Sequence, residues 1–243
     1  GRHGLLGLSD RLRTRQDEKI VRKFDSFVVL TEEDKGYWGE LPNIETIPNA
    51  AITTEATQSD CTAHRVIAVG RLDYQKGFDR LIKAWSIVKK DSEYSDWRLD
   101  IFGQGEWKEI LERMIQEKGL ADSAHINKPT NDIWNEYARS SMLVMSSHFE
   151  GLPMVMIEAM TCGLPAVTFD FKCGPKDIIE DGKNGLLVRE GDVPVLAEAM
   201  KRLMSDEPLR RRMGTEALKI KEKYSEEAVM GKWLELFEKL TKE

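Results

Sequence analysis

Residues 146–163 read SSHFEGLPMVMIEAMTCG and directly follow the short apolar run Met142–Met145. A short apolar run of this length is typical of a buried strand. Pro153 suits the first turn of a helix, and Gly163 suits the C-terminal cap of the same helix. The sequence therefore predicts a buried strand, a loop and a helix, in that order.

The same order of strand and helix continues on both sides of this stretch. Further strands are expected at Ser26–Leu30, Ile44–Ile47, Val66–Val69, Arg98–Phe102, Ala166–Phe169 and Gly185–Val188. Apolar residues recur at helical spacing in three of the intervening or following segments, around residues 78–88, 107–115 and 229–240. Gly119 is expected to end the second of these helices, and Ser225 to cap the start of the third. This alternation is typical of an α/β fold with a Rossmann-like parallel sheet flanked by helices.

The domain organisation is predicted from a polar stretch near residues 48–63, in which Thr53, Thr54 and Thr57 stand close together. We expect residues 49–63 to be a linker, residues 64–224 the Rossmann-like domain, and residues 225–243 a C-terminal helix. Residues 1–48 hold too few elements to bury a core alone. We interpret them as the remnant of an N-terminal domain that is otherwise missing.

Composition limits the classes of partner. The net charge of −6 argues against nucleic acid, whose phosphates require a basic face. No apolar stretch has the roughly 18–20 residues of a membrane span, and the chain does not begin with a signal peptide. The three cysteines are odd in number and lack metal-ligand spacing, which favours unpaired thiols in a reduced setting. We therefore expect a cytoplasmic protein without a transmembrane segment.

The segment VGRLDYQKG, residues 69–77, follows a predicted strand and precedes a predicted helix. Such a loop lies at the carboxyl edge of a parallel sheet, where α/β folds bind ligands. Arg71 offers a planar fork and Lys76 a point charge, and both suit phosphate oxygens. Two solvated surface cations are the equally weighted alternative.

The segment FGQGE, residues 102–106, has the same position after a strand. A dinucleotide fingerprint would need a small residue at position 108, where the chain has Lys108. Gly103 and Gly105 permit a ligand to approach the backbone. A tight turn between strand and helix is the favoured alternative.

Two carboxylates mark the opening stretch. Glu150 precedes the predicted helix, and Glu158 lies on it among apolar residues. The free amides near Gly151–Met154 are suited to bind an anion. A carboxylate on an apolar helix needs a hydrogen-bond partner, which a sugar or ribose diol would supply. The alternative is an acid that favours the helix dipole together with a surface glutamate.

Taken in order, these motifs resemble a known family. The segments that carry the resemblance are Gly70–Leu72 with Lys76–Phe78, Glu150–Pro153 with Glu158–Met160, Cys162–Val167 and Gly174–Val188. They are similar to the retaining glycosyltransferases of the GT4 type, the group 1 family, whose fold is called GT-B. Glu150 and Glu158, with seven residues between them, match the E-x7-E motif of that family.

The resemblance implies a role for each matched position. It implies that Arg71 and Lys76 hold the diphosphate of a nucleotide sugar, that Glu150 contacts the donor sugar, and that Glu158 contacts the ribose. These implied catalytic residues are Arg71, Lys76 and Glu150. The implied donor-binding set is Gly70, Arg71, Lys76, Gly103, Lys128, Pro129, Glu150, Gly151, Leu152, Pro153 and Glu158. No cofactor and no metal ion are implied.

The resemblance also implies the reaction. It is the transfer of a hexosyl or N-acetylhexosaminyl group, from a UDP-sugar rather than a GDP-sugar, to a glycan or lipid-linked acceptor. Retention of the anomeric configuration follows from same-face displacement. The chain would be the donor half and inactive alone, and the full-length protein would be cytoplasmic, with association at the inner membrane face left open. A non-catalytic nucleotide-sugar-binding module and a nucleotide-sugar epimerase are the alternatives.

Overall fold

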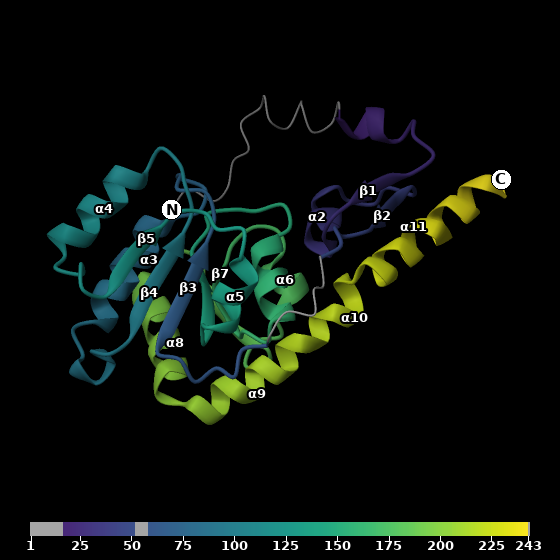
Figure 1. Cartoon of the computed structure of the whole chain (residues 1–243). Coiled ribbons are helices and arrows are strands. Elements are labelled where there is room, and N and C mark those ends of the chain that lie inside the picture. The colour runs from purple at the N-terminus through teal and green to yellow at the C-terminus, as the bar shows by residue number, and fades with distance from the viewer. Residues whose placement is uncertain (1–16, 52–57, 243) are drawn as a thin grey trace.

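The computed structural model describes residues 17–51 and 58–242, and it is built around one parallel sheet (Figure 1). The strands of this sheet are β3 (Arg65–Val69), β4 (Arg98–Phe102), β5 (Ala124–Asn127), β6 (Met142–Met145), β7 (Ala166–Asp170) and β8 (Gly185–Arg189). Their order across the sheet is β5-β4-β3-β6-β7-β8, and every neighbouring pair is parallel. The order reverses between β3 and β6, which is the point where doubly wound sheets bind ligands.

Helices cover both faces of this sheet. They are α3 (Phe78–Val88), α4 (Lys108–Glu117), α5 (Ile133–Ala138), α6 (Met154–Thr161), α7 (Pro175–Ile178), α8 (Val193–Ser205) and α9 (Glu207–Ala217), with 3-10 turns at Ser92–Tyr94 and Leu218–Ile220. Because crossovers between parallel strands are right-handed, the reversal of strand order between β3 and β6 puts α3 and α4 on one face, and α5 and α6 on the other. The α/β, Rossmann-like prediction is therefore correct.

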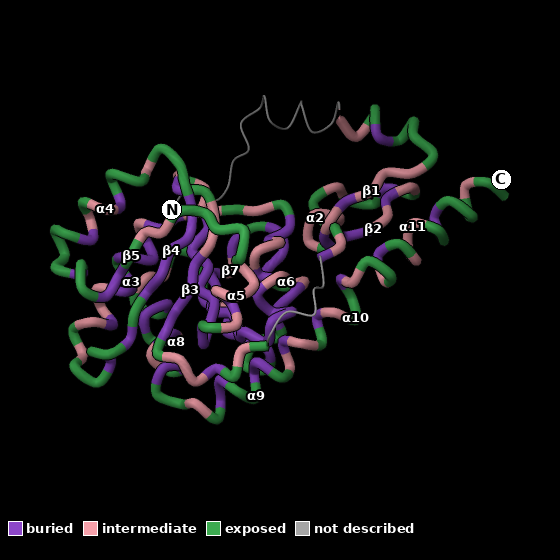
Figure 2. The backbone as a smooth tube through the Cα atoms, in the orientation of Figure 1, coloured by how far each residue is buried: buried purple, intermediate pink, exposed green. Residues whose placement is uncertain are grey.

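The core explains why the strands could be recognised. The central strands are buried on both faces, so their sequences are almost continuously apolar (Figure 2). The strand β5 is the exception, because no apolar run in the sequence predicted where it begins and ends. It lies at the edge of the sheet, and only Ala124 within it is fully buried.

Local signals at helix ends also hold. Ser225 Oγ accepts a hydrogen bond from the Ala228 amide at 3.2 Å, as an N-cap does. Gly163 has a positive φ of 79° after α6, and its amide donates to the Met160 carbonyl. One detail differs: Pro153 occupies the N-cap position of α6, one residue before the first turn.

A second, smaller unit lies beside the sheet. It contains β1 (Phe27–Val29), α2 (Glu32–Tyr37) and β2 (Ile44–Thr46), and β1 and β2 pair in parallel. After the sheet, the chain returns to this unit through α10 (Lys221–Tyr224) and α11 (Glu226–Thr241), and α11 runs alongside the small strands (Figure 1). Val229 and Leu236 of α11 pack with Ile47. The predicted division into residues 1–48, 49–63, 64–224 and 225–243 stays a prediction, and its residues 1–16, Thr53, Thr54 and Thr57 lie outside the described part.

Two further observations concern the sequence-based expectations. Cys61, Cys162 and Cys173 are all unpaired and buried. Within the described residues, no helix combines the length and the apolar character needed to cross a membrane.

Candidate functional site

The site begins where two loops meet at the carboxyl ends of β3 and β6. Gly77 has a φ of 60°, and a Cβ atom there would lie 2.3 Å from the Ser146 carbonyl oxygen. The His148 amide donates to the Gln75 carbonyl at 2.8 Å, and Ser146 Oγ donates to the Lys76 carbonyl at 3.1 Å. Backbone contacts therefore fix loop 70–77 against loop 146–153.

An ion pair joins the two loops. Lys76 Nζ lies 2.6 Å from Glu150 Oε1, and the two side chains are only 13% and 8% exposed. Ser147 Oγ donates to the same carboxylate oxygen at 2.7 Å. The stem of Lys76 passes over Gly70, where a Cβ would lie 3.0 Å from Lys76 Cδ. The ammonium group of Lys76 is therefore shielded from solvent, and the carboxylate of Glu150 is held in one orientation by Lys76 and Ser147.

The second cation, Arg71, is held less tightly. Its side chain is 69% exposed, and its Nη2 lies 3.2 Å from Asp73 Oδ2. The same guanidinium donates to Gln75 Oε1 at 2.7 Å. An exposed guanidinium beside a shielded ammonium offers two different donors to one anionic group.

A cavity of about 400 Å³ opens next to these loops. Its lining residues are Val69, Gly70, Arg71, Phe102, Gly103, Gln104, Pro129, Thr130, Ile133, Tyr137 and Glu158. A cavity of this size, mostly apolar with a few polar groups, is suited to a small organic ligand. It lies at the switch point of the sheet, on the side of α5 and α6.

Glu158 is the carboxylate of this cavity. Burial raises the pKa of Glu158 above its ordinary value, and a hydrogen bond from Tyr137 opposes that shift. The hydrogen bond is long, with 3.5 Å between Tyr137 Oη and Glu158 Oε2. Burial, with Glu158 next to it, also raises the pKa of Tyr137, so Tyr137 remains a hydrogen-bond donor. The carboxylate keeps acceptor capacity for hydroxyl groups of a ligand.

The glycine turn after β4 has a packing reason. A Cβ at Gly103 would lie 2.0 Å from the Gly70 carbonyl oxygen. Glycine is therefore required at position 103 by contact between two turns, although Gly103 also lines the cavity. The turn interpretation of FGQGE and the ligand-approach interpretation are both compatible with this geometry.

The structure brings most of the predicted site residues together and leaves Lys128 apart. Gly70, Arg71, Gly103, Pro129 and Glu158 line the cavity, and Lys76 and Glu150 form the adjoining ion pair. Leu152 and Pro153 are buried below the loop, whereas Gly151 is exposed. Lys128 is exposed and is not among the cavity-lining residues.

Sequence reasoning missed several residues of the site. Gln75 and Ser147 lie inside the quoted motifs, and both bond to Glu150. Tyr137 lies on α5, which no strong pattern marked because only one of its six residues is buried. The helical spacing of Ile133 and Tyr137 is the signal that could have indicated it.

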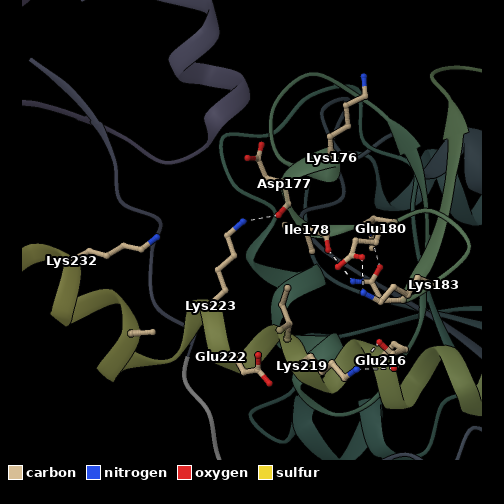
Figure 3. A pocket seen from close by; sticks show the side chains of 14 residues that line it. Lys176, Asp177, Ile178, Glu180, Lys183, Glu216, Lys219, Glu222, Lys223 and Lys232 are labelled. Carbon is tan, nitrogen blue, oxygen red and sulfur yellow. Dashed lines mark hydrogen bonds and ion pairs between the residues drawn. The ribbon is translucent and has the colours of Figure 1, made fainter. Parts of the chain in front are cut away.

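A larger cavity of about 610 Å³ lies elsewhere, between α7, α10 and α11 (Figure 3). Many of its charges already have partners nearby: Lys183 pairs with Glu180 at 2.7 Å, and Lys219 with Glu216 at 2.8 Å. Lys223 donates to the Asp177 carbonyl at 2.9 Å. This larger cavity lies beside the residues that precede β8, away from the switch point. Size alone therefore does not identify the site.

Among the residues that the structure describes, no group of three or more His, Cys, Asp or Glu side chains is placed to hold a metal ion. The charged groups at the switch point include Arg71, Lys76, Glu150 and Glu158. Together they can bind a ligand that combines an anionic group with several hydroxyls.

The sequence matches the family model "Glycosyl transferases group 1" over residues 53–220. It is 36% identical over 219 residues to an amylovoran biosynthesis glycosyltransferase of Erwinia amylovora, covering 86% of this chain and 61% of that protein. It is 33% identical over 232 residues to a poly(ribitol-phosphate) alpha-N-acetylglucosaminyltransferase of Staphylococcus aureus, covering 92% of this chain and 46% of that protein.

The fold of this chain is similar to that of a solved glycosyltransferase structure. The crystal structure of a Staphylococcus aureus TarM mutant in complex with fondaparinux, alpha-GlcNAc-glycerol and UDP matches 97% of this chain and 48% of that chain. Its TM-score is 0.83 at 29% identity. Across these comparisons, the chain spans less than two thirds of the length of the proteins it matches.

Proposed function

The chain belongs to the group 1 glycosyltransferases, and on that premise we propose that it forms the donor-binding half of a retaining enzyme. The donor is a nucleotide sugar, UDP-linked rather than GDP-linked, and the group transferred is a hexosyl or N-acetylhexosaminyl unit. The acceptor is a glycan or a lipid-linked glycan. The observation that carries the proposal is the shielded Lys76–Glu150 pair beside a cavity that contains Glu158.

The diphosphate is assigned to the two cations. Lys76 Nζ is already desolvated by its contact with Glu150, so a phosphate oxygen that reaches it replaces few water molecules. Arg71 is exposed enough to turn toward the same phosphates. Charge develops on the leaving diphosphate as the glycosidic bond breaks, and the two bound cations stabilise that charge. This mechanism requires no metal ion.

The hydroxyl groups are assigned to the two carboxylates. Glu150 is held by Ser147 and Gln75 as well as by Lys76, so its orientation persists when Lys76 turns toward a phosphate. It then accepts hydrogen bonds from the donor sugar. Glu158, deeper in the cavity, accepts from the ribose hydroxyls, and Pro129 borders the base.

The reaction proposed is same-face displacement. The acceptor hydroxyl attacks the anomeric carbon on the side that the diphosphate leaves, and its proton passes to the departing phosphate oxygen. No residue of this chain serves as a covalent nucleophile. Glu150 and Glu158 are instead assigned to different parts of the donor, since Glu150 belongs to the loop ion pair and Glu158 lines the cavity.

The preference for UDP rests on relatives, since the TarM structure contains UDP. The acceptor class rests on the amylovoran and poly(ribitol-phosphate) relatives, which are named for polymer synthesis. We place the full-length protein in the cytoplasm, where it works on polysaccharide precursors at the inner face of the membrane. We further propose that the present chain binds the donor and transfers little by itself.

The first test is calorimetric titration of the chain with UDP, GDP, UDP-glucose, UDP-N-acetylglucosamine and GDP-mannose. We expect selective binding of the uridine compounds. Replacing Lys76 by alanine should weaken that binding roughly 10- to 100-fold, because a charge-assisted hydrogen bond is lost. The matched control is Lys90→Ala, an exposed lysine after α3, which should leave the affinity unchanged.

Two outcomes would contradict the proposal. One is a folded wild-type chain that binds none of these compounds. The other is a Lys76→Ala variant that binds as well as wild type does. Selective binding of GDP compounds would keep the donor site and correct the base.

A further inference from the structure

The side chain of Gln75 lies between Arg71 and the loop that carries Glu150, and its contact with Arg71 has a consequence beyond the support of Glu150. Its Oε1 accepts a hydrogen bond from Arg71 Nη2 at 2.7 Å. Its Nε2 lies 3.1 Å from the Phe149 carbonyl oxygen and 3.3 Å from Glu150 Oε2. One amide therefore connects the guanidinium of Arg71 with the loop that carries Glu150.

The orientation of this amide is determined by its partners. A guanidinium only donates hydrogen bonds, whereas a carbonyl and a carboxylate only accept them. The amide oxygen must therefore face Arg71, and the amide nitrogen must face residues 149 and 150. The backbone adds a further constraint, because the Gln75 carbonyl accepts from the His148 amide at 2.8 Å.

Arg71 needs such a contact more than Lys76 does. The Lys76 ammonium is shielded and paired, but the Arg71 side chain is 69% exposed. A long exposed side chain loses rotamer freedom when it binds a ligand, and that loss weakens binding. The other partner of Arg71 is Asp73, 3.2 Å away, on the same loop as Arg71 itself.

We propose that Gln75 is a positioning residue for the donor: it holds Arg71 toward the Glu150 loop so that the diphosphate and the sugar are recognised in one fixed geometry. This inference rests on the proposed function, since it assumes a diphosphate at Arg71. Gln75 itself does not contact the reacting atoms; it acts through Arg71 and Glu150.

The proposal predicts a specific consequence for Gln75→Met, which keeps the length of the side chain and removes its hydrogen bonds to Arg71, Phe149 and Glu150. Among the described residues, Arg71 would then keep its pairing with Asp73 alone. We expect the affinity for UDP to fall roughly 3- to 10-fold, because Arg71 must be ordered by the ligand alone. Gln116→Met, an exposed glutamine on α4, is the matched control and should bind UDP as wild type does.

A double-mutant cycle separates this role from a structural one. UDP is titrated into wild type, Gln75→Met, Arg71→Ala and the double variant, with GDP in parallel and with thermal unfolding of each protein as the check on folding. If Gln75 acts through Arg71, Gln75→Met should change the affinity less than about 2-fold in the Arg71→Ala background. A loss that is equal in both backgrounds, or no loss in either, would overturn the inference.

The same experiment distinguishes the two levels of proposal. A folded wild-type chain that binds neither UDP nor GDP refutes the proposed function and, with it, the role of Gln75. Suppose that the wild-type chain binds one of them. If Gln75→Met then weakens binding equally with and without Arg71, or not at all, the role of Gln75 alone is refuted.

Discussion

At the scale of single residues, Glu158 combines two opposing demands. It lies on an otherwise apolar helix, where burial disfavours the charged carboxylate, and yet the proposed contact with ribose hydroxyls uses the charged form as an acceptor. The long hydrogen bond from Tyr137 compensates only in part. A carboxylate at such a position is better explained by a ligand than by the stability of the ligand-free fold.

This conflict predicts how stability depends on pH. The pKa of Glu158 is raised in the folded chain, so its contribution to stability is present at low pH and is lost as the pH rises through the elevated pKa. Glu158→Gln cannot ionise and should avoid that loss. We expect the variant to unfold at a higher temperature than wild type near pH 8, and at a similar temperature near pH 4.

Thermal unfolding at both pH values, without ligand, checks this prediction. Glu109→Gln, which replaces an exposed glutamate on α4, should show no comparable gain in unfolding temperature.

The Glu158→Gln variant should also bind UDP roughly 5- to 10-fold more weakly, since a neutral amide accepts hydrogen bonds less strongly than a carboxylate does. A Glu158→Gln variant that is less stable than wild type near pH 8 would show that the ionised form is satisfied within the fold.

At the scale of elements, the site depends on how closely two loops approach. Gly77 is the N-cap residue of α3, has a left-handed backbone conformation and lies directly against the Ser146 carbonyl. Any side chain at position 77 would force loop 70–77 away from loop 146–153. The Lys76–Glu150 contact of 2.6 Å would then be lost as well.

A pair of glycine substitutions tests this dependence. Gly119 has a similar φ of 64° after α4, but nothing lies within 4 Å of a Cβ placed there. Gly119→Ala should therefore lower the free energy of unfolding by roughly 1–2 kcal/mol, the cost of a left-handed alanine. Gly77→Ala adds a collision with the backbone and should lower it by roughly 3 kcal/mol or more.

Denaturant unfolding of both variants measures the difference. Equal losses would mean that loop 70–77 can shift at little cost. In that case the contact between the loops would not be needed to hold Lys76 and Glu150 together.

At the scale of the whole molecule, hydrogen bonds to α2 and the packing of α11 both attach the small unit to the rest of the chain. Asp177, on α7, accepts hydrogen bonds from the Glu32 amide at 3.0 Å and the Glu33 amide at 3.5 Å at the start of α2. In return, Glu33 accepts from the Cys173 amide at 2.9 Å. The second attachment is α11, which leaves the sheet domain and packs along the small strands.

The attachment through α11 gives a prediction with a matched control on one helix. Leu236 is 7% exposed and packs with Val229 and Ile47, whereas Leu234, two residues earlier, is 58% exposed. Leu236→Ala should destabilise the packing of α11 by roughly 2–4 kcal/mol, as deletion of buried methyl groups does. Leu234→Ala should have little effect.

Hydrogen exchange locates the change. We expect faster exchange in α11 and in β1–β2 for Leu236→Ala, with the six-stranded sheet unaffected, because units with few contacts open independently. Exchange in α11 of Leu236→Ala that is as slow as in the wild type would contradict the conclusion that Leu236 holds α11 to the small unit. So would an equal effect of the two substitutions.

The sequence by itself determined the fold class of this protein, every strand of the main sheet except β5, and the family to which the chain belongs. Buried parallel strands are nearly continuous apolar runs, and caps such as Ser225 and Gly163 follow from the local backbone, so short-range patterns were sufficient for both. The motifs also indicated Arg71, Lys76, Glu150 and Glu158, because each lies just beyond a predicted strand or on the following helix.

Only the tertiary structure decided how these residues meet. Lys76 and Glu150 are 74 residues apart, and no local pattern predicts that they pair, that Gln75 links Arg71 to the same loop, or that Tyr137 reaches Glu158. The edge strand β5, the exposed position of Lys128 and the packing of α11 on the small unit were decided in the same way. In each case the determining energy comes from contacts between distant segments, and a local pattern carries no record of them.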